Sequence, residues 1–337
     1  MRRMTKTSRP PAASSRSMAA ALLATGALTA LVGAAAAEGA VAEHVRNSGP
    51  PLRGEHTLQL EELWRLDLES EALLLGMIGD VAEGPDGNLY LLDRQTAEVH
   101  VFSSAGEHLR ALSRQGEGPG ETRRPRQLLF LADGTLGIVE SSPGRIVRLG
   151  LDGIPAGEIV PGGEEAAQGM RLLWRAAARG DALVGCTEAL QPGQGSFRRV
   201  RSLDRLAPDG AILATYLESA QERDMANFKW NEAEDYFVHQ GGFALGPDGY
   251  VYAAPERDRY RIDVYAPDGE RIRTIERADF ERVKRTAAER EQADAGMRMV
   301  INGREIEKEI ADYEPCIYQL RVDSHGRLWV THSRSVR

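Results

Sequence analysis

A short glycine turn followed by a strand of apolar and β-branched residues recurs along this chain. The copies are residues 85–93, 132–140, 247–254 and 324–331, with a weaker one at 179–185. A second glycine turn follows the units at 85–93, 132–140, 179–185 and 247–254, at Gly106, Gly153, Gly210 and Gly269 respectively. Glycine supplies the positive φ angle that a tight hairpin turn requires. Each unit therefore predicts four antiparallel strands joined by tight turns.

The spacing of these units predicts the architecture. Turn glycines at positions 87, 134 and 180 lie 47 and 46 residues apart, which is the length of one four-stranded propeller blade. Polar and apolar residues alternate within the units, and this excludes helical repeats of similar length. The sequence thus predicts an all-β fold, a β-propeller of four-stranded antiparallel blades. The predicted blades are about 76–122, 123–169, 170–236 and 237–278, with a partial blade at 313–337.

Longer gaps between the later units predict insertions. Two lie in the third unit, at residues 191–196 and 221–239. A third covers residues 279–312 and begins with a helical pattern near 279–295, for which Asp279 is the expected N-cap. We expect this helical insertion to lie outside the blades.

Residues 58–68 alternate between apolar and polar side chains, like a strand ahead of the first unit. In propellers such a strand completes the last blade and closes the ring, so we expect 58–68 to be a latch strand. With it, the predicted strands number about 19 of the 24 that a six-bladed ring requires. We therefore expect the C-terminal part of a six-bladed propeller, about 40–60 residues, to be missing after Arg337.

The first 42 residues predict a signal peptide. Residues 1–17 are basic, residues 18–37 form an uncharged apolar run, and Ala40-Val41-Ala42 fits a cleavage site. An uncleaved membrane anchor is the alternative. Residues 43–57 then form a linker, and no later apolar run approaches membrane length. We expect an exported protein, periplasmic or extracellular, with no membrane span after signal cleavage.

The charge balance excludes one class of partner. The chain has 42 lysines and arginines against 50 acids, and its formal net charge is −8. Five of the bases but a single acid lie within the predicted signal peptide, so the remainder is more acidic still. Nucleic-acid binding requires clustered basic residues, and we therefore expect no nucleic-acid partner.

Two cysteines, Cys186 and Cys316, lie far apart in the sequence. An exported protein could pair them, but two cysteines do not make a disulfide framework. We expect free, buried thiols that pack as small apolar side chains.

Several segments carry a family resemblance. They are PDGNLYLLD at 85–93, VHVFSSAG at 99–106, the loop GEGPGE at 116–121, and the tail motifs LRVD at 320–323 and GRLWV at 326–330. On these motifs, residues from about 58 to 337 resemble bacterial exported six-bladed β-propellers of the NHL-repeat type. The resemblance implies a fold and not an activity, because propellers serve many functions.

The functional surface of a propeller is normally one mouth of its central channel. It is lined by residues just before the first strand and just after the second strand of each blade. The ligand-binding candidates at these positions are Asp80, Arg126, Gln240, Asp93, Glu140 and Glu256, with Gln319, Glu188 and His332 at matching positions. Acids on one rim could bind a divalent cation such as calcium, or each acid could cap backbone N–H groups in its own turn. We expect mostly capped or paired acids, with Arg126 neutralising Asp80.

Aromatic residues are a further signal. Four of them crowd the 221–239 insertion, namely Phe228, Trp230, Tyr236 and Phe237. They either stack on a ligand or pin the insertion onto its own blade. Tyr90 and Trp329 each follow a turn glycine by three residues, and we expect both to be buried between neighbouring blades.

The sequence contains no motif of a serine hydrolase, a zinc protease or a P-loop enzyme. We therefore expect a non-enzymatic, exported propeller that presents one channel face to a small molecule, a carbohydrate or a protein. The alternative is a divalent-metal-dependent hydrolase or a lyase at the channel mouth. Calcium-dependent lactonases and arylesterases of related six-bladed folds resemble this arrangement, and His239 and His332 are candidate ligands or bases.

Overall fold

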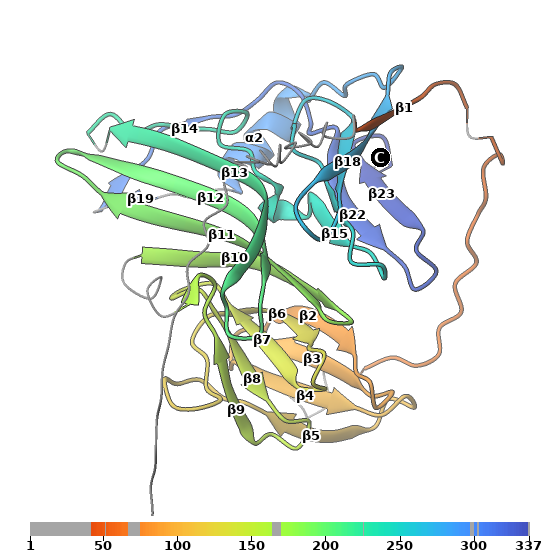
Figure 1. The fold of residues 1–337 in the computed structure, drawn as a ribbon, viewed down its shortest axis with the longest axis vertical. Coiled ribbons are helices and arrows are strands. Elements are labelled where there is room, and N and C mark those ends of the chain that lie inside the picture. The colour runs from red at the N-terminus through yellow and green to blue at the C-terminus, as the bar shows by residue number, and fades with distance from the viewer. Residues whose placement is uncertain are drawn as a thin grey trace, which may run out of the picture. The chain divides into compact units, whose positions relative to one another are not determined.

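The computed structural model describes residues 42–50, 52–66, 75–163, 170–224, 226–296, 300–301 and 303–335. The predicted signal peptide, apart from Ala42, lies outside these residues. Within the described ranges no helix is long and apolar enough to span a membrane. This part of the chain consists mainly of antiparallel sheets (Figure 1).

The first two blades are four-stranded antiparallel sheets whose strands follow sequence order. Blade 1 consists of β2 (Ile78–Glu83), β3 (Leu89–Asp93), β4 (Glu98–Phe102) and β5 (His108–Leu112). Blade 2 consists of β6 (Pro125–Phe130), β7 (Leu136–Glu140), β8 (Arg145–Leu149) and β9 (Pro155–Ile159). These sheets confirm the predicted four-stranded antiparallel blade.

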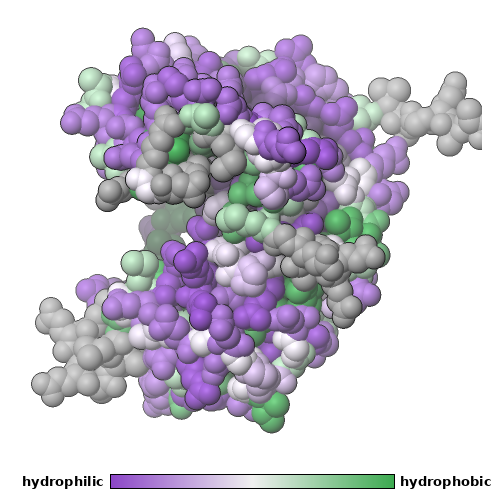
Figure 2. Space-filling view, turned by 90° about the vertical axis from the view of Figure 1, so that its left-hand side faces the viewer, coloured by the Kyte–Doolittle hydropathy of each residue, from purple (hydrophilic) through white to green (hydrophobic). Residues whose placement is uncertain are grey.

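Blade 3 has the same strand order but much longer strands. They are β10 (Met170–Arg179), β11 (Ala182–Pro192), β12 (Ser196–Leu206) and β13 (Ile212–Asp224). The predicted insertion at 191–196 extends the hairpin instead of forming a separate loop, because Pro192 on β11 pairs with Phe197 on β12. Seen from the side of this blade, the surface is mainly hydrophilic (Figure 2).

Blade 4 gains a fifth strand from the N-terminal part of the chain. Its own strands are β15 (Phe243–Leu245), β16 (Val251–Ala253), β17 (Arg261–Tyr265) and β18 (Arg271–Arg277). β1 (Glu43–Asn47), within the predicted linker, pairs in parallel with β18. The sheet order is therefore β1-β18-β17-β16-β15.

The latch strand predicted over 58–68 is wrong for the residues that the structure describes there. Residues 58–66 form no strand, and 67–68 lie outside the described residues. Alternating side chains do not make a strand without a backbone partner. This segment is fixed by a side chain instead, because Trp64 stacks on Phe102 and donates a hydrogen bond to the Ser104 carbonyl (3.1 Å).

The fifth sheet of the propeller contains β22 (Ile317–Val322) and β23 (Leu328–His332). Before it comes the helical insertion, whose helix α2 (Ala287–Ala295) is shorter than expected. Thr286 caps α2 in a capping box with Glu289, so the predicted N-cap at Asp279 is wrong. The Asp279 carboxylate instead accepts a hydrogen bond from the Gly49 N–H (2.8 Å).

The two large insertions are joined by backbone pairing. β14 (Trp230–Asn231) lies in the first insertion and pairs in parallel with β21 (Lys308–Glu309) of the second. The short hairpin of β19 (Val300–Ile301) and β20 (Arg304–Glu305) belongs to the second insertion, and η1 (Val238–Gln240) ends the first. The helical insertion therefore contacts the insertion that follows blade 3.

The first strands of the sheets follow one another around a shared axis. β2 contacts β6, β6 contacts β10, β10 contacts β15, and β15 contacts β22. Apolar side chains fill the space between adjacent sheets, as between blades 1 and 2, where Tyr90 packs edge-on against Phe130 (5.0 Å between ring centroids). This is the radial packing that defines a propeller.

Two predictions about buried residues have different outcomes. Tyr90 is fully buried, as expected, but Trp329 is 47% exposed and its predicted burial is wrong. The Trp329 side chain lies at the surface, where its indole N–H donates a hydrogen bond to the Asp323 carboxylate (3.0 Å).

Cys186 and Cys316 are free and buried, which confirms the expectation for both thiols.

Candidate functional site

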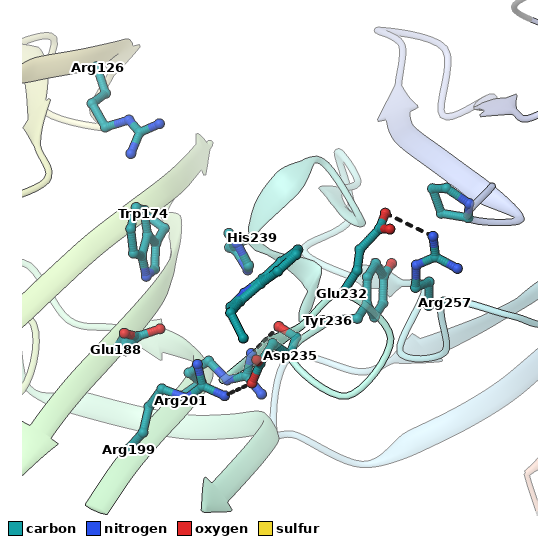
Figure 3. A pocket seen from close by; sticks show the side chains of 12 residues that line it. Arg126, Trp174, Glu188, Arg199, Arg201, Glu232, Asp235, Tyr236, His239 and Arg257 are labelled. Atoms are coloured by element: carbon teal, nitrogen blue, oxygen red, sulfur yellow. Dashed lines mark hydrogen bonds and ion pairs between the residues drawn. The ribbon is translucent and has the colours of Figure 1, made fainter. Parts of the chain in front are cut away.

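A cavity of about 410 Å³ lies where blades 2, 3 and 4 meet the insertions. Its lining combines arginines, acids and aromatic rings: Arg126, Trp174, Glu188, Arg199, Arg201, Trp230, Glu232, Asp235, Tyr236, His239, Arg257 and Pro315. Figure 3 shows these side chains converging from different segments of the chain. The volume of the cavity lies within the range of small-molecule sites, and its lining carries more charged side chains than the mainly apolar lining of most such sites.

Two of the lining residues occupy equivalent β-bulges. The register of β6 shifts between Pro125 and Gln127, which leaves Arg126 as the extra residue, and β10 shifts in the same way around Trp174. A bulge redirects the side chain of the extra residue and is often found beside a binding site. The Arg126 guanidinium lies over the Trp174 ring, 5.3 Å from its centroid.

Arg126 has no ion pair with any residue that the structure describes. Burial lowers the pKa of Arg126, and the nearby charge of Arg94 lowers it further. Its position over Trp174 is a cation–π contact, which partly offsets the cost of removing the guanidinium from water.

The floor of the cavity is built by the long strand β12. Arg199 and Arg201 lie two residues apart, so both side chains lie on the same face of the strand. Arg199 forms an ion pair with Asp235, while Arg201 donates a hydrogen bond to the Asp235 carbonyl (2.6 Å). Arg201 is 2% exposed and lies over the Phe237 ring at 5.1 Å. Burial, together with Arg199, lowers the pKa of Arg201 to about 10.

Glu188 lies directly opposite Arg201 in the β11–β12 register. Burial raises the pKa of Glu188, although the charges of Arg199 and Arg201 oppose that shift. Figure 3 shows its carboxylate next to Trp174. The cavity thus holds one carboxylate that is more easily protonated than an ordinary glutamate.

His239, on η1, contributes a neutral ring. Its ring centroid lies 5.5 Å from that of Trp174. Burial lowers the pKa of His239 to about 4, and the charges of Arg201 and Arg126 add to the effect. Its Nδ1 is buried and makes no hydrogen bond within the described part of the chain. This nitrogen can serve a ligand as donor or acceptor, depending on the tautomer.

The opposite wall comes from the insertions and blade 4. The Glu232 carboxylate accepts a hydrogen bond from Arg257 (2.8 Å) and two from Arg285 (2.6 and 2.9 Å). Tyr236 donates its hydroxyl hydrogen to the Ala254 carbonyl (3.0 Å). Of the four insertion aromatics, Phe228 and Phe237 are buried, whereas Trp230 and Tyr236 line the cavity.

Of the residues predicted for the channel mouth, Arg126 and Glu188 reach this cavity, and so does His239, which was predicted as a ligand or base. Asp93 and Glu140 do not, because they cap backbone instead. Asp93 accepts hydrogen bonds from the N–H groups of Gly76, Met77 and Gln95 (2.6–3.1 Å). Glu140, 1% exposed, accepts from the N–H groups of Arg123 and Arg124 and pairs with Arg145 (2.8 Å).

The remaining acids are also engaged. Glu256 pairs with Arg261 (2.7 Å). Asp80 accepts hydrogen bonds from the N–H groups of Val81 and Leu128 (both 2.9 Å), and Arg126 is not its partner as predicted. Burial raises the pKa of Asp80, opposed by these backbone bonds and by the charges of Arg175 and Arg321. The expectation of capped or paired acids is confirmed for Asp80, Asp93, Glu140 and Glu256, whereas Glu188, the fifth acid at these positions, lines the cavity.

Asp80 and Arg126 fail to meet because their registers differ. Asp80 is equivalent to Gln127, the residue after the bulge, and both side chains bind backbone of the next blade. The Gln127 amide bonds the carbonyl and the N–H of Ala176 (2.7 and 3.1 Å). These two positions therefore join adjacent first strands.

The other predicted candidates lie elsewhere. Gln240 ends η1, and its side chain is not among those described. Gln319 lies on β22, and His332 on β23 packs against Phe280 (5.4 Å between ring centroids). In the described part of the chain, no three Asp, Glu, His or Cys side chains come together as a metal-ligand group.

Sequence reasoning missed several residues of the cavity, namely Trp174, Arg199, Arg201, Glu232, Asp235 and Arg257. Trp174 is at the position in blade 3 that Arg126 occupies in blade 2, so alignment of the repeats could have found it. Arg199 and Arg201 lie on the third strand of blade 3, whereas the expected mouth positions lie only before the first strand and after the second strand of each blade. They reach the cavity because β12 is unusually long and Asp235 folds back onto it.

Comparisons with known proteins concern the fold. A family model described as a 6-bladed beta-propeller matches residues 66–158. A search of curated proteins finds no match.

Among solved structures, virginiamycin B lyase from Staphylococcus aureus with quinupristin is 12% identical, with a TM-score of 0.39. That match covers 76% of this chain, which spans only 62% of the lyase chain. The PQQ-bound aldose sugar dehydrogenase from Streptomyces coelicolor is 13% identical, with a TM-score of 0.36 and coverage of 77% and 76%. A Bacteroides fragilis protein described as exported is 9% identical, with a TM-score of 0.42. That match covers 87% of this chain and 81% of the other. The strand topology and the family match together show that this chain is a β-propeller whose matched segment is of the six-bladed type.

Proposed function

We propose that this protein is an exported β-propeller that binds a small molecule in the cavity between blades 2, 3 and 4. One observation carries the proposal. The two equivalent bulges aim Arg126 and Trp174 into the same cavity, where the guanidinium has no ion-pair partner among the described residues. A cavity of about 410 Å³ accommodates a ligand of ordinary metabolite size.

The lining favours binding over catalysis by the described residues. The carboxylates of Glu232 and Asp235 are held by arginines, and His239 is neutral at neutral pH. None of these three groups is paired with a nucleophile in the manner of a catalytic constellation. The aromatic rings and the partnerless Nδ1 of His239 instead offer contacts to a bound ring and its polar substituents.

A ligand screen tests this proposal. The purified protein is melted in the presence of a panel of sugars, organic acids, amino acids and short peptides, and binding raises the melting temperature. The Trp174→Ala variant should lose the shift for any compound that binds here. Trp329→Ala, which changes the same residue type outside the cavity, should keep it. No stabilising compound, or equal shifts in both variants, would overturn the proposed site.

A further inference from the structure

The cavity has an unbalanced set of charges. The Asp235 carboxylate pairs with both Arg199 and Arg223 (2.7 Å to Arg223), and the Glu232 carboxylate binds both Arg257 and Arg285. Each of these acids is thus neutralised from two sides. Arg126 and Arg201 remain without a carboxylate at ion-pair distance in the described chain, and Glu188 is the remaining acid.

Arg201 is the most deeply buried of the arginines that lack a carboxylate partner. It is almost completely buried, one of its terminal nitrogens is occupied by the Asp235 carbonyl, and its Nε makes no hydrogen bond within the described residues. A guanidinium held out of water without an anion is unfavourable unless something supplies the negative charge. The facing acid, Glu188, meets that need only in part, because its own burial favours the protonated form.

The aromatic residues of the cavity indicate what the uncharged part of the ligand is. Trp174 and His239 lie 5.5 Å apart at an angle of 39°, and Trp230 also lines the space. Trp174 and His239 contact each other and form one aromatic surface next to guanidinium groups, which suits an aromatic or sugar ring that carries an acidic group. A carboxylate matches the fork of an arginine in two parallel hydrogen bonds.

We infer that this cavity takes a ring carboxylate. Its acid group binds Arg126, its ring lies against Trp174 and His239, and the buried charge of Arg201 adds to the positive potential of the cavity. The inference rests on the proposed function and narrows it to one ligand chemistry. Two sources supply such a group, an aromatic acid and a uronic acid, and the experiment distinguishes them.

Isothermal titration of the purified protein compares matched pairs of probes. The pairs are 2-naphthoate with 2-naphthamide, and glucuronate with glucose. The carboxylate of the preferred pair should bind at least tenfold more tightly than its neutral partner, and its affinity should fall as salt is raised. Equal affinity within both pairs would overturn the inference while leaving the proposed site in place, and so would failure of all four probes when another compound still binds at Trp174.

Variants locate the anion. Arg126→Gln should weaken the preferred carboxylate about tenfold and bring it close to the neutral partner. Arg124→Gln is the matched control, because Arg124 is exposed, lies two residues away and is absent from the cavity lining. A second measurement is independent of any unfolding caused by the variants. The bound anion should raise the pKa of His239 above its value of about 4, as followed by NMR of the ring protons. An unchanged pKa together with unchanged binding in Arg126→Gln would exclude the anion site.

Discussion

Glu232 and Arg285 form a two-pronged ion pair, with Nη1–Oε2 and Nη2–Oε1 distances of 2.6 and 2.9 Å. The residues belong to different insertions and are 53 positions apart. Arg257 adds a third hydrogen bond from blade 4 (2.8 Å), and the Ala311 N–H a fourth (3.0 Å). Glu232 therefore ties both insertions to blade 4 at the wall of the cavity.

Replacing Glu232 tests how much this junction stabilises the protein. Burial alone would raise the pKa of Glu232, but the bonds from Arg285 and Arg257 outweigh it and hold the pKa below its ordinary value. Glu232→Gln should lower the free energy of unfolding at pH 7 by roughly 2–3 kcal/mol, since charged hydrogen bonds are lost and buried guanidiniums remain. Urea melts give the value.

The pH dependence of this effect has a definite sign. Because the pKa is lowered in the folded state, the stability from Glu232 is present above the ordinary glutamate pKa and is lost as pH falls below it. The gap between wild type and Glu232→Gln should therefore shrink in acid. Glu307→Gln, which removes an exposed pair with Lys229, should cost under about 1 kcal/mol. A gap that stays constant with pH would contradict the assigned role.

Tyr90 and Trp329 form a second matched comparison, since they occupy the same position in their blades. Tyr90→Ala should cost roughly 3–5 kcal/mol, because the ring is fully buried between sheets and its hydroxyl donates to Asp86 (2.9 Å). Trp329→Ala should cost clearly less, because about half of that side chain is already in water. Similar losses in denaturant melts would show that Trp329 is buried in solution.

This difference marks the limit of what the repeats predict. The turns depend only on neighbouring residues. Asp133 and Asp209 each accept a hydrogen bond from the N–H two residues further along the chain, and the residue after each aspartate is a glycine with positive φ. The blades could therefore be predicted from sequence. Burial of Trp329 depends on a neighbouring sheet, and the β1–β18 pairing depends on which sheet edge is free. Neither the burial of Trp329 nor the β1–β18 pairing can be predicted from a local sequence pattern.

The candidate site shows the same division. Arg126 and Glu188 obey a positional rule of propellers, so sequence alone could nominate them. The same rule nominated Asp93 and Glu140, which bind backbone N–H groups, because a carboxylate after a strand satisfies either role equally well. Only the three-dimensional contact between Asp235 and β12 brings Arg199 to the cavity.

Substitutions at two turn glycines distinguish the cost of a left-handed backbone from the cost of a steric clash. Gly134 and Gly210 both have positive φ, +79° and +88°. A Cβ on Gly134 would meet nothing within 4 Å, whereas one on Gly210 would lie 2.0 Å from the Val160 carbonyl oxygen. Gly134→Ala should cost about 1 kcal/mol from the left-handed backbone alone. Gly210→Ala should cost a further 1–3 kcal/mol or so, because the backbone must shift. Equal costs in urea melts would show that the Gly210–Val160 approach is absent in solution.

His239 provides a test of the cavity's electrostatics without any ligand. Its pKa is lowered from an ordinary value of 6.5 to about 4, first by burial and then by the arginines around it. Because the folded state resists protonation, the stability linked to this histidine is present above pH 6.5 and is lost as the pH falls from 6.5 towards 4. The loss should reach roughly 2–3 kcal/mol.

His239→Gln should remove this component, because the amide does not titrate. At pH 7 the variant and the wild type should differ little, and as the pH falls towards 4 the wild type should lose stability faster. Urea melts of both proteins at half-unit intervals measure the difference, which cancels the titration of all other groups. His325→Gln is the control, since that ring is exposed in the turn after β22. Parallel stability curves for wild type and His239→Gln would mean that the ring is accessible to water, and that the cavity is more open than its lining indicates.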